Sequence, residues 1–119
     1  MTGEDVTDYE MITATHAVLA LLSPRWAVPV LYTLAGGTRR YSELLYEVGE
    51  ISKKTLTQTL RSLERDGLVA RREIPAVPTR VEYSLTPLGW SLTEPLVAMY
   101  EWAAQHLSAA DPHDEQLAA

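Results

Sequence analysis

Hydrophobic residues recur along this chain with two different periods, which predict helices and strands in turn. Five segments carry apolar residues at the three- or four-residue spacing of a helix: 8–22, 24–35, 42–48, 52–66 and 87–107. Residues 68–74 and 80–86 are both predicted to be strands. In residues 80–86, apolar residues alternate with polar ones, as in a sheet with one face in water. Residues 38–41 are short and extended. The predicted order is helix, helix, short strand, helix, tight turn, helix, hairpin and helix.

Capping residues and helix breakers set the expected boundaries. Gly49 provides the left-handed residue that the tight connection before the fourth helix needs, and Gly67 stops that helix. Pro29 should bend or shorten the second helix, and Pro95 should kink or divide the last one. The expected N-terminal caps are Thr7 (in a capping box with Glu10), Ser23 (before Pro24), Ser42, Ser52 and Thr86 (before Pro87).

This order of elements is typical of a winged helix-turn-helix, in which a helix follows a short turn and a β-hairpin forms the wing. The fold class is mainly α with a small β-hairpin (α+β), and the 119 residues suit one domain, 1–119. We expect residues 38–86 to form a DNA-binding core, with the wing at 68–86. The helices at 8–22 and 96–107 carry apolar stripes too wide for the surface of a monomer, which predicts a homodimer.

The segment "ISKKTLTQTLRSLERDG", residues 51–67, has a lopsided polar face. Leu56, Leu60 and Leu63 recur at helical spacing and should face the core, so positions 53, 54, 57, 58 and 61 point outward. Those positions hold two lysines, a threonine, a glutamine and an arginine, and no acidic residue precedes Glu64. Glutamine pairs with adenine, arginine and lysine pair with guanine, and a helix N-terminus attracts phosphate. The pattern indicates a helix that reads DNA in the major groove.

The net charge conceals a segregation of charges. The formal net charge is -6 and the isoelectric point is about 4.9, which argues weakly against a nucleic-acid partner. All ten basic residues nevertheless lie between Arg25 and Arg80 with six acids, whereas the two flanks hold ten acids and no lysine or arginine. A basic middle between acidic flanks is compatible with a surface that binds a polyanion. Chance segregation of solvated charges is the alternative.

These features together predict which residues contact DNA. They combine the polar residues of helix 52–66 with arginines that precede the third helix or follow the wing loop, where a DNA backbone passes. The predicted set is Arg39, Arg40, Ser52, Lys53, Lys54, Thr55, Thr57, Gln58, Arg61, Arg65 and Arg80. The wing loop, residues 74–81, is expected on the backbone or in the minor groove of a pseudo-palindromic operator.

Aromatic residues and one methionine concentrate in the helices expected to dimerise: Tyr9, Trp26, Tyr32, Trp90, Met99, Tyr100 and Trp102. They favour an interface between two copies of the chain. The alternative is an aromatic-lined pocket for a planar small molecule, because ligand pockets are apolar with a few polar groups. Sequence alone leaves both interpretations open.

Missing residue types and patterns exclude several kinds of chemistry. Without cysteine there are no disulfides, thiolate metal sites or thiol redox reactions. No apolar run approaches 18 residues and the first ten residues are acidic, unlike a signal peptide, so we expect a cytoplasmic protein. The three histidines form no catalytic constellation, so no enzyme activity and no cofactor are predicted. His16 is expected on a helix surface or interface. The C-terminal end of the chain is expected to be a solvated acidic tail. The alternative is a metal site formed by His106, Asp111, His113 and Asp114.

Several motifs together resemble those of the HxlR-type winged-helix regulators of bacteria. They are "RW" at 25–26, "RRYSELL" at 39–45, "ISKKTLTQTLRSLERDGLVAR" at 51–71, "VPTRVEYSLTPLG" at 77–89 and "EW" at 101–102. The resemblance implies a homodimeric transcriptional regulator, with a repressor as the expected type, that places helix 52–66 in the major groove. Many such regulators carry a thiol-sensing cysteine where this chain has Thr13, so no thiol sensing is expected. A winged-helix module that binds proteins instead of DNA is the alternative function.

Overall fold

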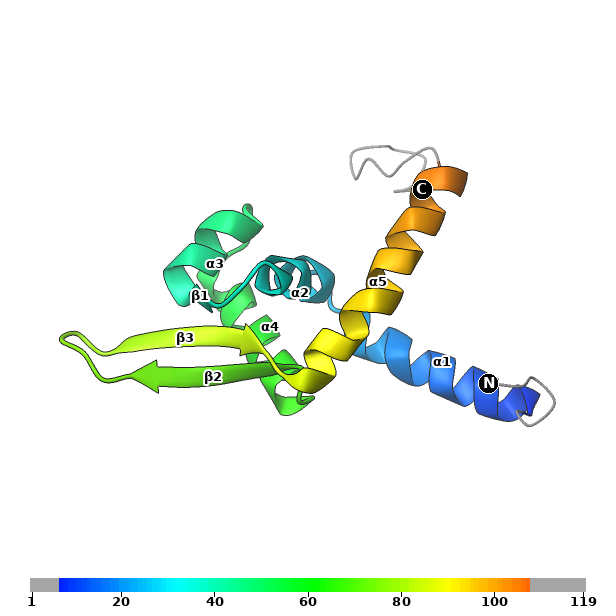
Figure 1. Cartoon of the computed structure of the whole chain (residues 1–119), viewed down its shortest axis with the longest axis horizontal. Helices are drawn as coiled ribbons and strands as arrows, with labels where there is room; N and C mark the ends of the chain where they lie inside the picture. The colour runs from blue at the N-terminus through cyan, green and yellow to red at the C-terminus, as the bar shows by residue number, and fades with distance from the viewer. Residues whose placement is uncertain (1–6, 108–119) are drawn as a thin grey trace.

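The computed structural model describes residues 7–107, in which five helices and three strands follow one another. In chain order they are α1 (Asp8–Leu22), α2 (Ala27–Ala35), β1 (Arg39–Arg40), α3 (Tyr41–Val48), α4 (Lys53–Arg65), β2 (Val69–Ile74), β3 (Arg80–Leu85) and α5 (Pro87–His106). This order confirms the predicted winged helix-turn-helix. Figure 1 shows α2, α3, α4 and the sheet gathered together, with α1 and α5 extending away from them. We call the gathered part the body, and α1 and α5 the arms.

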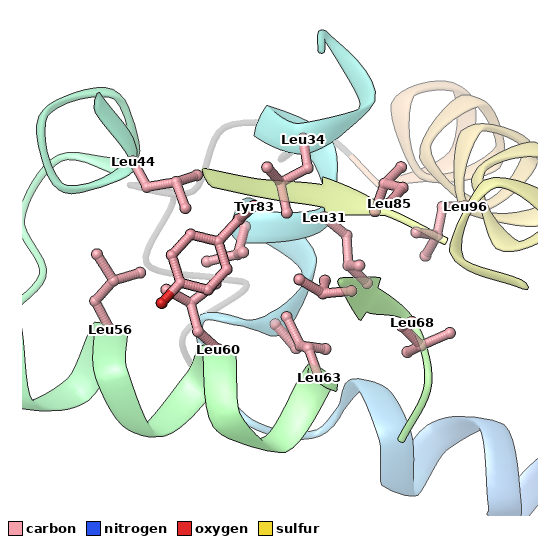
Figure 2. Close-up of a cluster of buried hydrophobic side chains, with 13 residues drawn as sticks. Leu31, Leu34, Leu44, Leu56, Leu60, Leu63, Leu68, Tyr83, Leu85 and Leu96 are labelled. Carbon is pink, nitrogen blue, oxygen red and sulfur yellow. The ribbon is translucent and has the colours of Figure 1, made fainter. Parts of the chain in front are cut away.

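A leucine-rich core holds the body together. Leucines from three helices are at most 2% exposed: Leu31 and Leu34 of α2, Leu44 of α3, and Leu56, Leu60 and Leu63 of α4. Figure 2 shows Tyr83 and Leu85 of β3 among these side chains. Each such leucine stabilises the fold by about 1.5–3 kcal/mol relative to an exposed one. The inward direction predicted for the three leucines of α4 is confirmed.

The sheet has three antiparallel strands in the order β1-β3-β2. The wing hairpin pairs Val69 with Leu85 at its base and Ile74 with Arg80 near its tip. On the other edge, Arg39 lies opposite Tyr83. The sequence predicted an extended segment here but not its pairing, because two residues are too few to display an alternation. Through β1, the start of α3 is joined to the wing.

Both ends of α4 are fixed by hydrogen bonds. At the N-terminus, Ser52 Oγ accepts from the Thr55 backbone N–H at 3.1 Å, as predicted for a cap. At the C-terminus, Gly67 has a φ of 79°, which glycine adopts without strain. The Leu68 N–H then reaches back to the Leu63 carbonyl at 2.9 Å and closes the helix. The side chains of α4 are therefore presented from a well-defined frame.

The predicted start of α2 was wrong. Ser23 ends α1 rather than capping α2, and its hydroxyl donates to the Ala20 carbonyl at 3.1 Å. Because α2 begins only at Ala27, Pro29 falls in its first turn, where backbone N–H groups have no partner within the helix. Pro29 therefore costs no internal hydrogen bond, and α2 is shorter at its N-terminus than predicted.

The predicted cap of α3 was also wrong. Ser42 lies inside α3, which begins at Tyr41 with Arg40 as the capping residue. The Glu43 carboxylate accepts a hydrogen bond from the Arg40 backbone N–H at 2.7 Å, which satisfies the amide of the capping residue. Ser42 cannot act as the cap, because it is already the second residue of the helix.

Pro95 does not divide the last helix, contrary to one of the two predicted outcomes. α5 is continuous from Pro87 to His106, capped as predicted by Thr86, whose hydroxyl oxygen accepts from the Gly89 N–H at 3.0 Å. A proline leaves the carbonyl four residues earlier, here that of Ser91, without its helical donor. Pro95 and Ser91 are both exposed, so water can hydrogen-bond to that carbonyl.

The arms contribute little to the core. No residue of α1 is buried, and in α5 only Gly89 and Leu96 are. The radius of gyration is 16.5 Å, against about 13 Å for a compact domain of 100 residues, because the arms extend outward. One side-chain hydrogen bond ties α5 to the body, from the Tyr32 hydroxyl to the Leu96 carbonyl at 3.0 Å. Burial, with a smaller effect of the nearby Tyr100, raises the pKa of Tyr32.

The joint between α5 and the wing is closely packed. The Thr86 N–H donates to the Leu68 carbonyl at 3.1 Å, and the Thr86 hydroxyl donates to the Gly67 carbonyl. A Cβ at Gly89 would overlap the Leu68 carbonyl oxygen, so only glycine fits against that backbone. The first turn of α5 and the first residues of the wing therefore touch backbone to backbone.

Candidate nucleic-acid interface

A continuous polar ridge runs along the outer side of α4. With the leucines of α4 buried, a rotation of 100° per residue places one set of side chains directly opposite the core. These side chains, which we call the α4 ridge, are Lys54, Gln58, Arg61 and Arg65, and all four are exposed. Every member is a cation or an amide. The ridge can therefore donate hydrogen bonds to base edges without presenting a carboxylate to the phosphates.

The two flanks of the α4 ridge have different neighbours. On the flank toward the sheet, Thr57 and Glu64 line a hollow of about 380 Å³ together with Arg71 and Tyr83. The opposite flank faces the link between α1 and α2, residues 23–26. The ridge consequently stands between the wing and this link, and anything bound along it would meet both.

Hydrogen bonds at the N-terminal end of α4 already engage several of the predicted contact residues. Ser52 Oγ, besides its role as the cap, donates to Thr55 Oγ1 at 2.9 Å. The Tyr41 hydroxyl donates to the Lys53 carbonyl at 2.9 Å and lies 3.0 Å from Thr57 Oγ1. Tyr41, in the segment "RRYSELL", was not predicted to have a role, yet it fixes α3 against α4. The sequence could not predict this contact, because it depends on how α3 packs against α4.

Arg39 and Arg80, predicted near the DNA backbone, are both held in ion pairs. Arg39 Nε lies 3.2 and 3.0 Å from the two carboxylate oxygens of Glu47, and its guanidinium lies over Gly36. Arg80 Nε lies 3.4 Å from the Glu82 carboxylate and has no hydrogen-bond partner among the described residues. Partly exposed pairs of this kind contribute about 0–1 kcal/mol, so a phosphate can compete with either carboxylate.

The remaining basic residues divide into paired and unpaired ones. Arg65 and Arg71 lie 3.8 Å from Asp66 and Glu73 respectively. Within residues 7–107, the basic residues without a carboxylate partner are Arg25, Arg40, Lys53, Lys54, Arg61 and Arg72. The sequence-based prediction of DNA contacts did not include Arg25, Arg71 or Arg72. The signal that could have included them is the confinement of every basic residue to 25–80.

The tip of the wing carries no charge. Its sequence, "IPAVPT" at residues 74–79, ends next to Arg80, and Val77 is fully exposed before a cis peptide bond to Pro78. Between the wing loop and the start of α3 lies a hollow of about 560 Å³, lined in part by Arg40, Tyr41 and Arg80. The uncharged tip is therefore followed directly by a cation, Arg80, at the loop end of β3, with Arg40 across the hollow.

The predicted ligand or interface residues are spread over the chain. Trp26 lies beside α4, whereas Tyr32 contacts α5. The others, which are between 48% and 78% exposed, are Tyr9, Trp90, Met99, Tyr100 and Trp102. Trp102 stacks on His106 with ring centroids 4.9 Å apart. These five residues make the arms an exposed apolar surface.

The described residues form neither a metal site nor a single membrane-spanning helix. Among residues 7–107, no three histidine or acidic side chains are grouped closely enough to hold a metal ion. Asp111, His113 and Asp114 of the alternative metal site lie outside the described residues, and His16 is exposed on α1. No single described helix has the length and hydropathy of a membrane span; α1 and α2 reach them only when taken together, across a bend of 80°.

Known proteins resemble this chain over most of its length. A family model described as HxlR-like helix-turn-helix matches residues 21–111. The uncharacterized HTH-type transcriptional regulator YtfH of Escherichia coli (strain K12) is 43% identical over 93 residues, covering 78% of this chain and 74% of that protein. An uncharacterized HTH-type transcriptional regulator of Methanothermobacter thermautotrophicus is 36% identical over 114 residues, covering 96% and 87%.

A solved structure agrees with these relatives. The reduced form of the transcriptional regulator YodB from B. subtilis superposes with a TM-score of 0.73 at 31% identity, covering 83% of this chain and 94% of that one. All three of these proteins are described as transcriptional regulators. Motifs, fold and relatives therefore agree, and this chain belongs to the HxlR-like helix-turn-helix family of transcriptional regulators.

Proposed function

We propose that this protein is a sequence-specific repressor that binds double-stranded DNA as a homodimer, with α4 in the major groove. The α4 ridge is the observation that carries the proposal. Its glutamine and cations suit the hydrogen-bonding pattern of base edges, where each well-formed bidentate pair is worth about 1–3 kcal/mol of discrimination. A dimer seated on a promoter would occlude it, which is the basis for assigning repression. We expect such a regulator in the cytoplasm, where a bacterial chromosome lies.

The exposed apolar surface of the arms supports the homodimer. On α1, four large apolar side chains are 41–54% exposed: Met11, Ile12, Val18 and Leu19. On α5, Val97 and Met99 are 45% and 49% exposed, alongside exposed aromatic residues. Large exposed apolar surfaces mark interaction sites. We assign the exposed aromatic residues to the interface rather than to a small-molecule pocket, because they extend along both arms.

Two-fold symmetry then sets the form of the operator. A dimer of helix-turn-helix subunits binds half-sites about 34–36 Å apart, one turn of the double helix, or a multiple of that spacing. The operator is therefore expected to be pseudo-palindromic. Arg40, Lys53, Lys54 and Arg80 are proposed to contact phosphates near each half-site, together with the hydroxyl groups at the start of α4.

The test is to select DNA from a random pool with the purified protein and to sequence it. Affinity for the selected duplex and for a scrambled duplex is then measured at several salt concentrations. We expect a pseudo-palindrome, a strong preference for the selected sequence, and binding to both duplexes that weakens as salt rises. Absence of binding at low salt would favour the alternative function, a winged-helix module that contacts proteins.

A further inference from the structure

We infer that Arg25, supported by Trp26 and by hydroxyl groups of α4, binds a DNA phosphate on the flank of α4 that faces away from the wing. This inference rests on the proposed function, because it requires α4 to lie in the major groove. It adds a contact to the strand that the wing does not reach. Neither the ridge nor the wing supplies that contact.

The site lies where the link between α1 and α2 passes α4. Arg25 and Trp26 immediately precede α2, and they line a hollow of about 390 Å³ together with Thr55, Gln58 and Ser62 of α4. Gln58 also belongs to the α4 ridge, so the hollow opens directly beside a residue proposed to read bases. A group bound along the ridge at Gln58 therefore has Arg25 as a neighbour.

The Arg25 side chain is positioned but not neutralised. Its guanidinium carbon lies 5.3 Å from the centroid of the Trp26 ring, which holds the charge over an aromatic face. Arg25 is exposed, and within the described residues no carboxylate pairs with it. On the opposite flank, by contrast, Arg71 lies 3.8 Å from the Glu73 carboxylate. The positive charge of Arg25 is thus available to an anion from outside the chain.

The dimensions of DNA indicate a phosphate as that anion. An α-helix with its side chains is about 10–12 Å across and the major groove is about 12 Å wide, so a helix in the groove has a backbone beside each flank. The flank toward the sheet has cations of the wing close by. The side chains that line the hollow on the other flank include one cation, Arg25, and two hydroxyl groups suited to phosphate oxygens, those of Thr55 and Ser62.

The experiment compares Arg25→Gln with the wild-type protein on two duplexes of about 30 base pairs, the selected operator and its scrambled form, long enough for two half-sites. Because a dimer carries two Arg25 residues, we expect the slope of log affinity against log salt to fall by about 1.8, which is about 0.9 for each phosphate contact. Affinity at low salt should fall by roughly a hundredfold on both duplexes, or about tenfold for each charge-assisted hydrogen bond. The ratio of specific to scrambled affinity should not change.

Two further variants separate a phosphate contact from a general effect of charge or fold. Arg25→Lys keeps the charge and should retain most of the salt slope. Tyr46→Glu lowers the net charge by one, as Arg25→Gln does, at a position of α3 that is 87% exposed and outside the proposed contacts, and should leave the slope nearly unchanged. Thermal unfolding of each variant checks that the body remains folded.

Ethylation of single phosphates gives a readout that does not depend on affinity alone. Wild-type binding should be blocked by ethylation on both backbones that border α4, and Arg25→Gln should lose the interference on one of them. If the wild type binds DNA while Arg25→Gln keeps the same salt slope and the same interference pattern, the inference is wrong and the proposed function stands. If the wild type binds no duplex, both are wrong.

Discussion

The body and the arms both carry apolar residues at helical spacing, yet they bury them very differently. α4 has three leucines, and all of them are at most 2% exposed. α1, with methionine, isoleucine, valine and leucine along its length, has no buried residue. A helical apolar stripe therefore predicts that a surface will be covered, but not that the same chain covers it. The core lies in the body, whereas in the proposed dimer a second chain would cover the arms.

The most direct way to break this comparison is to place a charge in an arm. Ile12→Asp removes an apolar side chain that is 54% exposed in the single chain. A symmetric dimer loses this side chain from both copies. At about 1.5–3 kcal/mol per buried isoleucine, the dimer should be weakened by roughly 3–6 kcal/mol. Light scattering at micromolar concentration should then find a monomer whose circular dichroism still resembles the wild type.

A matched change keeps this result interpretable. Thr13→Asp introduces the same charge one position along α1, outside the predicted apolar stripe, and should remain dimeric. A wild-type protein that is already monomeric under these conditions would contradict the proposed dimer. So would an Ile12→Asp variant that remains a dimer.

A change in the body should affect stability instead of assembly. Leu60→Ala creates a cavity in the core and should lower the free energy of unfolding by about 2–5 kcal/mol. Leu19→Ala is the same chemical change on an arm, where the side chain is 53% exposed. Measured by urea unfolding in the monomeric Ile12→Asp background, Leu19→Ala should cost less than about 0.5 kcal/mol. Equal costs at the two sites would remove the distinction between body and arms.

Within the body, the α4 ridge should separate base contacts from phosphate contacts. Gln58→Ala and Arg61→Ala should each weaken the selected operator by about 1–3 kcal/mol while hardly changing affinity for scrambled DNA. Arg80→Ala is the comparison, because loss of a phosphate contact should weaken both duplexes alike and reduce the salt slope by about one per contact, or about two for the dimer. If the ratio of specific to scrambled affinity survives both ridge substitutions, α4 does not read the sequence.

The smallest expected effect concerns the contact that joins an arm to the body. Tyr32→Phe removes the hydrogen bond to the Leu96 carbonyl but keeps the ring. That carbonyl is part of α5 and the ring is partly exposed, so the cost should be about 0.5–1.5 kcal/mol of unfolding free energy. Thermal unfolding of the monomeric background measures it. Tyr100→Phe, which removes a hydroxyl without changing this bond, should be nearly neutral.

The helices and the wing were predictable because their signals are local. Leu56, Leu60 and Leu63 repeat at helical spacing, and Ser52 and Gly67 mark the ends of α4. The errors arose where a local signal depended on its neighbours. Ser23 can cap a helix only if the next residues turn into one, but the chain continues to Ala27 before α2 begins.

Only part of the candidate interface could be predicted, because some of its features depend on contacts between separate elements. The outward direction of the α4 ridge follows from periodicity within one helix. The hydrogen bonds of Tyr41 and the ion pair between Arg39 and Glu47 depend on how separate elements pack, and no spacing along the chain encodes that. The sequence-based prediction did not include Arg25, because it lies in a link between helices, where no periodicity indicates which way a side chain points.

The glycine contact at the base of α5 has a mechanical consequence. Gly89 rests on the Leu68 backbone, so the long arm and the wing meet at a joint with no room for a side chain between them. A stiff joint transmits rotation. In the proposed dimer, the angle at which the two α5 helices cross would therefore set the distance between the two wings. Such a protein would gauge an operator by length as well as by sequence, and one base pair inserted between the half-sites would misalign it without altering a single contacted base.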